Sequence, residues 1–484
     1  MKKLSYIALF TLVFSACTKL EENAPFIEEQ NFYQTSDDAL AAVTGVYSQL
    51  SHDVSGLRDF GLYQRQLHLT TDLISDDAVA GIGATNTNVR NLGDVNFTTS
   101  NDRIEKTWRQ HYSGINRANA VIENIAPMTI DANLKKRLTG ETKFIRALLY
   151  FNVVRLWGNA PLLLKPTNGD DVLNGKLNIK RSPVADIYKQ IIADLSNAEA
   201  SLPNSFSGAD LGRATQGAAK SLLAKVYLTQ KDWTNAAAKA REVINGPYGY
   251  DLFANFADVF NTASKNGHEH VFSVQFKSIA GNANNMGILS MPNPLVAKPA
   301  GGPLRGNEAD VPQAGLYEQF SADDTRRDAT FYTELTVNGV KYTFPPHFKK
   351  YFDPTVVNNP SLSGINFPVL RFSDVLLIYA EALNEQGGPT GDAYTAINRV
   401  CTRAGLAGLS GLSQEQFRQA VYQERRLEFV YEFQRWFDLL RTRRMVTELH
   451  AHGKANAAEK HYLLPIPQRE LDNNPNLGPQ NPGY

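Results

Sequence analysis

Three carboxylates stand close together in the stretch "TTDLISDDA", and closely spaced carboxylates can do chemistry. They are Asp72, Asp76 and Asp77. Two carboxyl groups about 5 Å apart can hydrolyse a glycosidic bond, and carboxylate clusters can bind calcium. Successive helical residues diverge by about 100°, so Asp72 and Asp76 could share a helix face, whereas Asp76 and Asp77 would not. Acidic turns and helix ends give this pattern far more often, so a surface glycosidase is kept only as an alternative.

A second candidate site is the pair of imidazoles in "HEH", where Glu269 separates His268 from His270. Residues two apart point to the same face of a strand, so both rings could face one metal ion. A metal would need further ligands, and solvated histidines on an edge strand explain the pattern better. The sequence has no HExxH, GxSxG, Walker or CxxC motif. These residues therefore do not require an enzyme, and no cofactor or metal site is identified from them, although a structural calcium stays open.

One of the two cysteines lies where lipid chemistry would act. Lys2 and Lys3 precede an apolar run, and the stretch "FSAC" brings small residues directly before Cys17. The run is long enough for a signal peptide and too short for a membrane span, which needs about 20 apolar residues. This pattern is typical of a bacterial lipobox, whose cysteine is acylated and becomes the new N-terminus. We expect a signal peptide over residues 1–16 and a lipidated polar tether over 17–35, with an ordinary signal and a chance cysteine as the alternative.

The charge balance is neutral, because Lys and Arg total 49 and Asp and Glu also total 49. A neutral chain has no global electrostatic attraction to nucleic acid or to anionic membranes. Once Cys17 is lipidated, Cys401 has no cysteine partner, so no intrachain disulfide is expected. Stability must then come from a large hydrophobic core, for which the chain is long enough.

The elements that must position these groups are predicted to be mainly helical. Ser36 can cap a helix over residues 36–50, with two aspartates in the first turn. Two longer helices are predicted over residues 102–126 and 133–157. The stretch "PVADIYKQIIADLSNAEASL" has its apolar residues at helical spacing, which predicts an amphipathic helix.

Two later segments indicate paired helices. In "AKVYLTQKDWTNAAAKAREVI", the intervals from Ala224 and Tyr227 to Ala236 match those of the tetratricopeptide helix pair. The stretch "YAEALNEQGGPTGDAYTAINRV" repeats the order from Ala380 to Ala393 with one extra residue in the turn. We expect a scaffold of packed helix pairs in which small residues allow close approach.

The segments between the predicted helices are predicted to be strands and long loops. Residues 268–276 alternate like a strand, and "FYTELTVNGVKYTF" predicts a hairpin with Asn338-Gly339 at its turn. Residues 78–101 and 277–315 are rich in Gly, Asn and Pro, and loops of this length are usually functional or mobile.

Part of the first loop, Ala78 to Asp94, has no aromatic residue. Its polar side chains could hydrogen-bond the hydroxyls or carboxylates of a ligand, although solvated loop groups are the simpler explanation for any one of them. These candidate ligand-binding residues are Asn86, Asn88, Arg90 and Asn91.

Late in the chain, "ERRLEFVYEFQRWFDLLRTRRM" predicts one helix with two adjacent stripes. The apolar stripe consists of Phe429, Phe433, Trp436 and Leu440. The charged stripe consists of Arg425, Glu428, Glu432 and Arg435, with opposite charges at i+3 spacing. The interleaved acids favour a structural ion-pair network over nucleic-acid binding. All four tryptophans fall on predicted helices, so core packing is expected for each.

This late segment resembles the signature of SusD/RagB-family outer-membrane lipoproteins of Bacteroidetes-type bacteria. "FPVLRFSDVLLIYAEALNE" and "YLLPIPQRELDNNPNLGPQNPGY" are similar to the same family, as are "FYQTSDDALAAVTGVY" and "RALLYFNVVRLWGNAPLL". The resemblance covers nearly all of the mature chain, in family order. Cys401 departs from it, because the family more often has Arg there, and a surface ion pair is expected to be lost.

The resemblance implies a mainly α fold of tetratricopeptide-like helix pairs with a loop-rich, partly β face. It implies an N-terminal region over 36–245 and a C-terminal region over 246–484, packed as one unit. It also implies a lipid anchor at the outer membrane through Cys17 and capture of an oligosaccharide, or in some members a peptide, without catalysis. The implied partner is a SusC-like TonB-dependent transporter. Starch is disfavoured, because the aromatic platforms of starch-binding members are missing from the loop Ala78 to Asp94.

Overall fold

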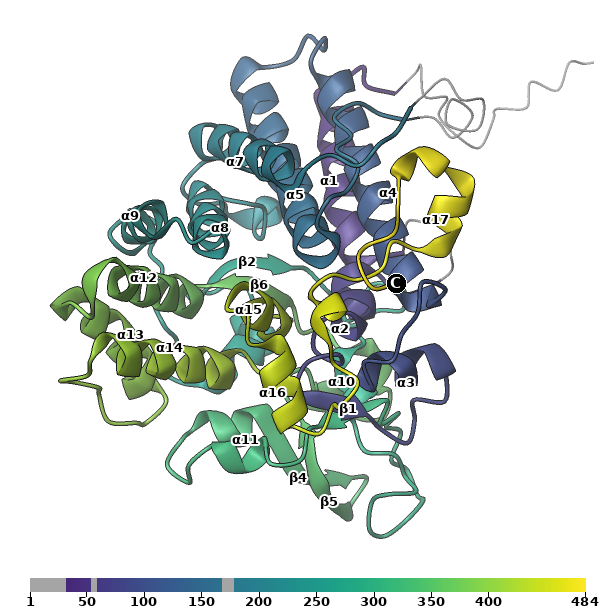
Figure 1. The fold of residues 1–484 in the computed structure, drawn as a ribbon, viewed down its shortest axis with the longest axis vertical. Coiled ribbons are helices and arrows are strands. Elements are labelled where there is room, and N and C mark those ends of the chain that lie inside the picture. Colours follow the sequence, from purple (N-terminus) through teal and green to yellow (C-terminus); the bar gives the residue numbers. More distant parts are fainter. Residues whose placement is uncertain (1–31, 54–58, 168–177) are drawn as a thin grey trace, which may run out of the picture.

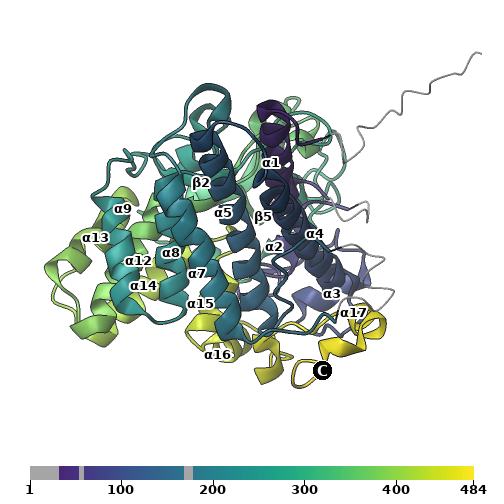
Figure 2. The ribbon, with the colours of Figure 1, turned by 90° about the horizontal axis from the view of Figure 1, so that it is seen from above.

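Helices run side by side through most of the chain, in a row that Figures 1 and 2 show from two directions. The computed structural model describes residues 32–53, 59–167 and 178–484. Cys17, the predicted signal peptide and most of the predicted tether lie outside these residues. The row consists of α1 (Ser36–Ser51), α4 (Asp102–Ile125), α5 (Ala132–Trp157), α7 (Val184–Ser201), α8 (Gln216–Thr229), α9 (Trp233–Ile244), α12 (Phe372–Gly387), α13 (Gly391–Arg403) and α14 (Gln414–Phe429).

Each helix of this row packs against the next: α1 on α4, α4 on α5, and so on to α13, while α14 packs on α12. The predicted pairs are α8 with α9 and α12 with α13, so both predictions of paired helices are confirmed. Ala224, Ala236 and Ala380 are fully buried, as close approach of the helices requires. The mainly α, tetratricopeptide-like fold is thus the observed one.

The capping residue of the first helix lies one position earlier than predicted. Thr35, rather than Ser36, is the N-cap, and its hydroxyl accepts a hydrogen bond from the Asp38 amide at 3.2 Å. The Asp38 carboxylate in turn accepts from the Thr35 amide at 2.7 Å. This reciprocal capping box needs an acceptor three residues after the cap, which Asp38 supplies for Thr35.

Shorter helices complete the fold outside the row. They are α2 (Leu67–Leu69), α3 (Thr87–Gly93), α10 (Met286–Ser290), α11 (Arg326–Thr330), α15 (Arg435–Arg441), α16 (Met445–Ala451) and α17 (Gln468–Asn473). The strands of the described residues form three antiparallel pairs: β1 (Ala78–Ala80) with β3 (Asp310–Pro312), β2 (His270–Val274) with β6 (Phe367–Arg371), and β4 (Phe331–Val337) with β5 (Val340–Phe348).

The predicted hairpin and strand are both present. Asn338 and Gly339 connect β4 and β5 with φ angles of 50° and 81°. This left-handed pair is the conformation that an Asn-Gly turn favours. Strand β2 occupies part of the predicted 268–276 segment and lies against the helical row.

The late segment is not one helix, which corrects the prediction. α14 ends at Phe429 and α15 begins at Arg435. Between them Tyr431 and Phe433 have positive φ angles of 65° and 60°. Non-glycine residues in this region cost about 1 to 3 kcal/mol each, so other contacts must compensate.

Those contacts come from distant parts of the chain. The Tyr431 ring stacks on Phe348 with centroids 4.2 Å apart, and Phe433 stacks on Phe367 at the same distance. The Phe433 amide also donates to the Asp72 carboxylate at 3.2 Å. Helical periodicity is a local signal, so it could not predict this break.

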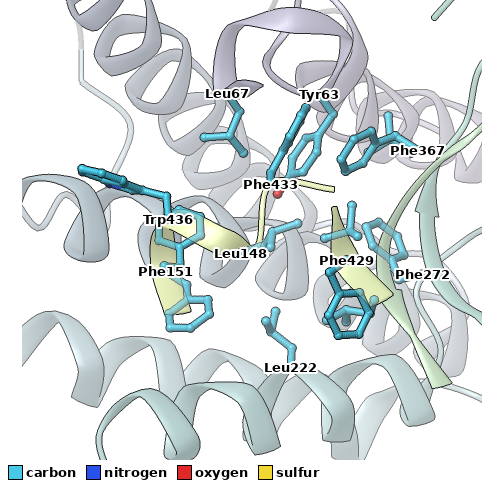
Figure 3. Close-up of a cluster of buried hydrophobic side chains, with 14 of the residues drawn as sticks. Tyr63, Leu67, Leu148, Phe151, Leu222, Phe272, Phe367, Phe429, Phe433 and Trp436 are labelled. Atoms are coloured by element: carbon cyan, nitrogen blue, oxygen red, sulfur yellow. The ribbon is translucent and has the colours of Figure 1, made fainter. Parts of the chain in front are cut away.

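The larger of two core clusters in the described residues runs from Ala39 in α1 to Leu477 near the C-terminus, and the smaller one packs around the β4–β5 hairpin. Figure 3 shows part of the larger cluster, where Tyr63, Phe367 and Phe433 lie close together and Trp436 lies to one side. Of the predicted apolar stripe, Phe429, Phe433 and Trp436 are buried and Leu440 is partly buried.

Candidate binding site

Two loops that are far apart in sequence form one surface, which we call the loop face: residues 78–101 and 277–315. β1 pairs with β3, so that Ala78 lies opposite Pro312 and Ala80 opposite Asp310. The ladder continues beyond the strands, since the Gly83 amide donates to the Glu308 carbonyl at 2.8 Å. The two loops that the sequence singled out are therefore one structural unit.

Gly83 is required by this close approach. A Cβ at this position would lie 1.7 Å from the Asn307 carbonyl oxygen and 2.7 Å from its carbon. Backbone atoms cannot move aside as a flexible side chain can, so any larger residue would separate the two loops.

The four predicted ligand-binding residues lie on or next to the short helix α3 of this face. Asn86 is its N-cap and accepts from the Asn88 amide at 2.8 Å. Arg90 is exposed and donates to the Ala84 carbonyl at 3.0 Å. The half-buried side chains of Asn88 and Asn91 have no hydrogen-bond partner within the described chain. Their role in ligand binding stays a prediction.

Apolar side chains project from the loop face, which sequence analysis did not predict. Ile82 is 58% exposed, Ile279 55% and Leu295 75%. Ile82 sits between two glycines that rest on residues 307–309, and Glu308 also accepts from the Asn293 amide at 2.8 Å. The sequence feature that could have predicted these exposed side chains is a large apolar residue inside a Gly-rich stretch. They offer nonpolar contact area where aromatic residues are missing.

A cleft of about 510 Å³ opens beside the loop face. Asp59, Phe60 and Gln64 line one wall, and Gly281 and Asn285 line the other. Arg103 and Lys106 both donate to the Asp59 carboxylate at 2.6 Å.

These two cations also set the charge of Asp59. Burial raises the pKa of Asp59, but the hydrogen bonds and charges of Lys106 and Arg103 lower it below its usual value. An ionised carboxylate, an amide and one aromatic ring suit a hydroxylated ligand.

The acidic trio is buried, so the possibility of an open catalytic pair is wrong. Asp72, Asp76 and Asp77 are at most 2% exposed. Arg435 binds the Asp76 carboxylate through two hydrogen bonds of 2.7 and 2.8 Å, and Arg426 donates to Asp77 at 2.8 Å. Burial alone would raise the pKa of Asp76, yet the two arginines hold it well below its usual value.

The trio is a structural ion-pair centre. Asp76, Glu448 and His452 bring their ligand atoms within 4.8 Å of one another, the one such metal-like group among the described residues. Arg435 and Arg426 already take the Asp76 oxygens, and two adjacent guanidinium groups repel a metal cation. This centre ties the start of β1 to the late helices.

The histidine pair does not form a metal site either. Glu269 binds Arg371 at 2.7 Å and Arg403 at 2.9 Å. His270 is 8% exposed, and its Nε2 lies 2.9 Å from the Val259 carbonyl. The expectation of solvated histidines therefore holds for exposed His268 and is wrong for His270, because β2 packs against the core.

The predicted ion-pair network is confirmed, but its partners are not the i+3 neighbours. Arg371 donates to Glu428 at 2.7 Å and to Glu432 at 2.8 Å, and Lys350 donates to Glu432 at 2.7 Å. Arg425 pairs with Asp374 at 2.8 Å. Each residue of the predicted charged stripe thus pairs with another element, a property that spacing along one helix does not reveal.

Cys401 corrects a smaller expectation. It lies on α13, is 3% exposed, and burial raises the pKa of its thiol to about 12. Its substitution for Arg therefore changes a buried position and not a surface ion pair.

The fold and the loop face together define a helical-repeat protein with one face built from two paired loops. A model described as the SusD family matches residues 332–484, and one described as starch-binding and associating with outer membrane matches residues 35–228. SusD-like protein P2 of Formosa agariphila is 31% identical over 100% of this chain and 99% of its own length. The chain therefore belongs to the SusD family, as the resemblance predicted.

Two solved structures superpose on this chain over most of its length. A laminarin-binding SusD-like protein superposes with a TM-score of 0.80 and 26% identity, over 93% of this chain and 100% of the other. A SusD superfamily protein from Parabacteroides distasonis gives 0.80 and 27% over 93% and 99%. Among the relatives found by sequence, a SusD-like protein from Bacteroides ovatus is 27% identical over 90% of this chain and 82% of its own length.

In the described part of the chain, no helix has the length and apolarity needed to cross a bilayer.

Proposed function

We propose that this protein is a cell-surface lipoprotein that captures a glycan and delivers it to a SusC-like TonB-dependent transporter. The observation that carries this proposal is the match over 93% of the chain to a protein named for laminarin binding. The family model described as starch-binding and associating with outer membrane supports the same class of ligand and the same location.

The loop face is the proposed binding surface. Asn88, Arg90 and Asn91 on α3 offer amide and guanidinium groups to sugar hydroxyls, with Asn86 holding the helix start. Exposed aliphatic groups bury apolar sugar faces at about 25 cal/mol per Å² of area removed from water. Such shallow contacts give binding in the millimolar to micromolar range, which corresponds to about −4 to −8 kcal/mol.

Attachment to the membrane is proposed to run through acylated Cys17. One acyl chain gives only marginal membrane binding, and two or more give stable anchoring. The polar segment that follows then permits the domain to move over its transporter.

Catalysis is not part of the proposed function. The three carboxylates that could have served a glycosidase are buried, Asp76 and Asp77 against arginines and Asp72 beside His68, so a bound glycan cannot reach them. The glycosidase alternative therefore has no site among the described residues.

A double substitution tests the binding surface. Asn88→Ala with Asn91→Ala should weaken binding of the glycan identified on an array about 5-fold or more, since a hydrogen bond contributes about 1 kcal/mol. Asn245→Ala, at an exposed position beyond α9, is the matched control and should bind normally. Unchanged affinity in the double variant, or selective binding of peptides in place of glycans, would contradict the proposal.

A further inference from the structure

A second cleft, of about 560 Å³, lies between α4 and α17. Figures 1 and 2 show these two helices next to each other, where the C-terminal segment returns along α4. None of the residues that line this α4–α17 cleft belongs to the loop face. The volume is in the range of about 300 to 1,000 Å³ that is usual for small-molecule sites.

Two aromatic side chains form the floor of the cleft. The rings of Trp108 and Tyr112 have centroids 4.7 Å apart and an interplanar angle of 41°. Tyr112 is held in place because its hydroxyl donates to the Pro161 carbonyl at 2.9 Å. The floor is therefore a fixed apolar surface.

The indole N–H of Trp108 has no acceptor among the residues that the structure describes, although the side chain is only 3% exposed. This N–H is not one of the fully buried side-chain atoms that lack a partner, so it remains accessible to solvent at the cleft. An unpaired donor in the floor of a cleft points to an acceptor that comes from a ligand or solvent.

Two polar side chains of the cleft are held by hydrogen bonds to the chain, and three others are not. The Asn116 side chain donates to the Thr167 carbonyl at 3.1 Å, and Asn474 donates to the Ile179 carbonyl at 2.9 Å. In contrast, the side chains of Ser113, Glu470 and Asn473 make no hydrogen bond within the described chain. Three polar side chains thus line the cleft, together with the two rings, and their hydrogen-bonding capacity is not used within the described chain.

We propose that the α4–α17 cleft is a saccharide-binding site that recognises a hexopyranose unit. The apolar face of the sugar lies on Tyr112 and the edge of Trp108, whose N–H donates to a sugar oxygen. Hydroxyl groups bind Ser113, Glu470 and Asn473, which offer a hydroxyl, a carboxylate and an amide. This site goes beyond the capture of glycan at the loop face, and two sites on one polysaccharide would add avidity.

Fluorine NMR of the full-length protein tests this proposal. The protein, labelled with 5-fluorotryptophan and purified in detergent, is titrated with laminarihexaose, maltohexaose and cellohexaose to about 20 mM, above the range expected for a weak site. Trp108→Phe serves only to assign the Trp108 resonance. We expect at least one hexasaccharide to shift this resonance along a saturable curve.

Substitutions at the rim of the cleft then distinguish binding in the cleft from a Trp108 shift caused by binding elsewhere on the protein. Asn473→Ala should raise the midpoint of the Trp108 titration about 5-fold, because the loss of one hydrogen bond costs about 1 kcal/mol. Asn476→Ala is the control, because Asn476 is exposed and does not line the cleft. The inference is overturned if no hexasaccharide shifts Trp108, if Asn473→Ala titrates like the unsubstituted protein, or if Asn88→Ala with Asn91→Ala abolishes the shift.

Discussion

His68 is a charged histidine with no access to solvent. Its Nε2 lies 2.6 Å from the Asp310 carboxylate and its Nδ1 lies 3.7 Å from that of Asp72. The rings of Tyr431 and Phe433 cover it, and the Tyr431 hydroxyl donates to Asp310 as well. Burial lowers the pKa of His68, but the two carboxylates outweigh burial and raise it to about 9. The imidazolium therefore fastens β3 of the loop face to the core.

This charge predicts a pH-dependent stability. A folded-state pKa raised from 6.5 to about 9 stabilises the protein fully below pH 6.5, and the stabilisation is lost as pH rises through about 9. His68→Gln should therefore lower Tm more at pH about 6 than at pH about 10. Thermal unfolding of both proteins across this pH range measures the difference in Tm. Other titrating groups, such as Lys350 and Lys454, are present in both proteins, so their effects cancel in that difference. An equal Tm loss at every pH would contradict a charged His68.

Trp436 is predicted to stabilise the core and not to bind ligand. It is 1% exposed, and removal of a buried large aromatic side chain costs about 3 to 5 kcal/mol. Trp436→Ala should lower the free energy of unfolding by that amount in denaturant titrations, whereas Trp233→Ala, at a half-buried position, should cost less. A Trp436→Ala protein with normal Tm and lost glycan binding would make this ring a ligand platform.

At the scale of elements, the union of the two loops depends on Gly83. Gly83→Ala should separate residues 81–83 from 307–309, because the added carbon would overlap the Asn307 carbonyl. We expect faster hydrogen exchange at the Gly83 position and weaker glycan binding, while the helical row stays folded. Gly45→Ala in α1 is the control, since its Cβ would meet nothing within 4 Å. Unchanged hydrogen exchange and unchanged glycan affinity in Gly83→Ala would contradict the requirement for glycine at this position.

Elements whose signal is local could be predicted from the sequence. α4, α5 and the α8–α9 pair follow from helical periodicity, and the β4–β5 turn follows from Asn338-Gly339. The break after Phe429 could not, because it depends on stacking with Phe348 and Phe367, which are distant in the chain. The same reason explains why the aspartate trio resembled a catalytic site: its arginine partners follow it by about 350 residues.

The binding site was predictable only in outline. Composition identified both loops of the loop face, but pairing between them is a tertiary property. The polar cleft at Asp59 and the aromatic floor at Trp108 were missed, since neither has a motif and both are assembled from several segments.

At the scale of the whole molecule, membrane attachment is predicted to depend on Cys17. Cys17→Ser should remove the acyl chains that hold the protein at the outer membrane and so release it, because two or more acyl chains are what gives stable anchoring. Cell fractionation in a strain without the transporter measures this, with Cys401→Ser as the control that keeps the anchor. A Cys17→Ser protein that still fractionates with outer membrane would contradict the lipid anchor.

The central claim is that the protein binds a glycan and leaves it intact. The most direct measurement incubates the chain from Thr18 onward with each glycan that it retains in affinity electrophoresis, and follows reducing ends over about a day, long enough to detect turnover far below ordinary enzyme rates. We predict saturable binding with unchanged glycan, in the unsubstituted chain and in Asp72→Asn and Asp76→Asn variants that remain folded. Reducing ends that accumulate in the unsubstituted protein and vanish in either variant would contradict the account.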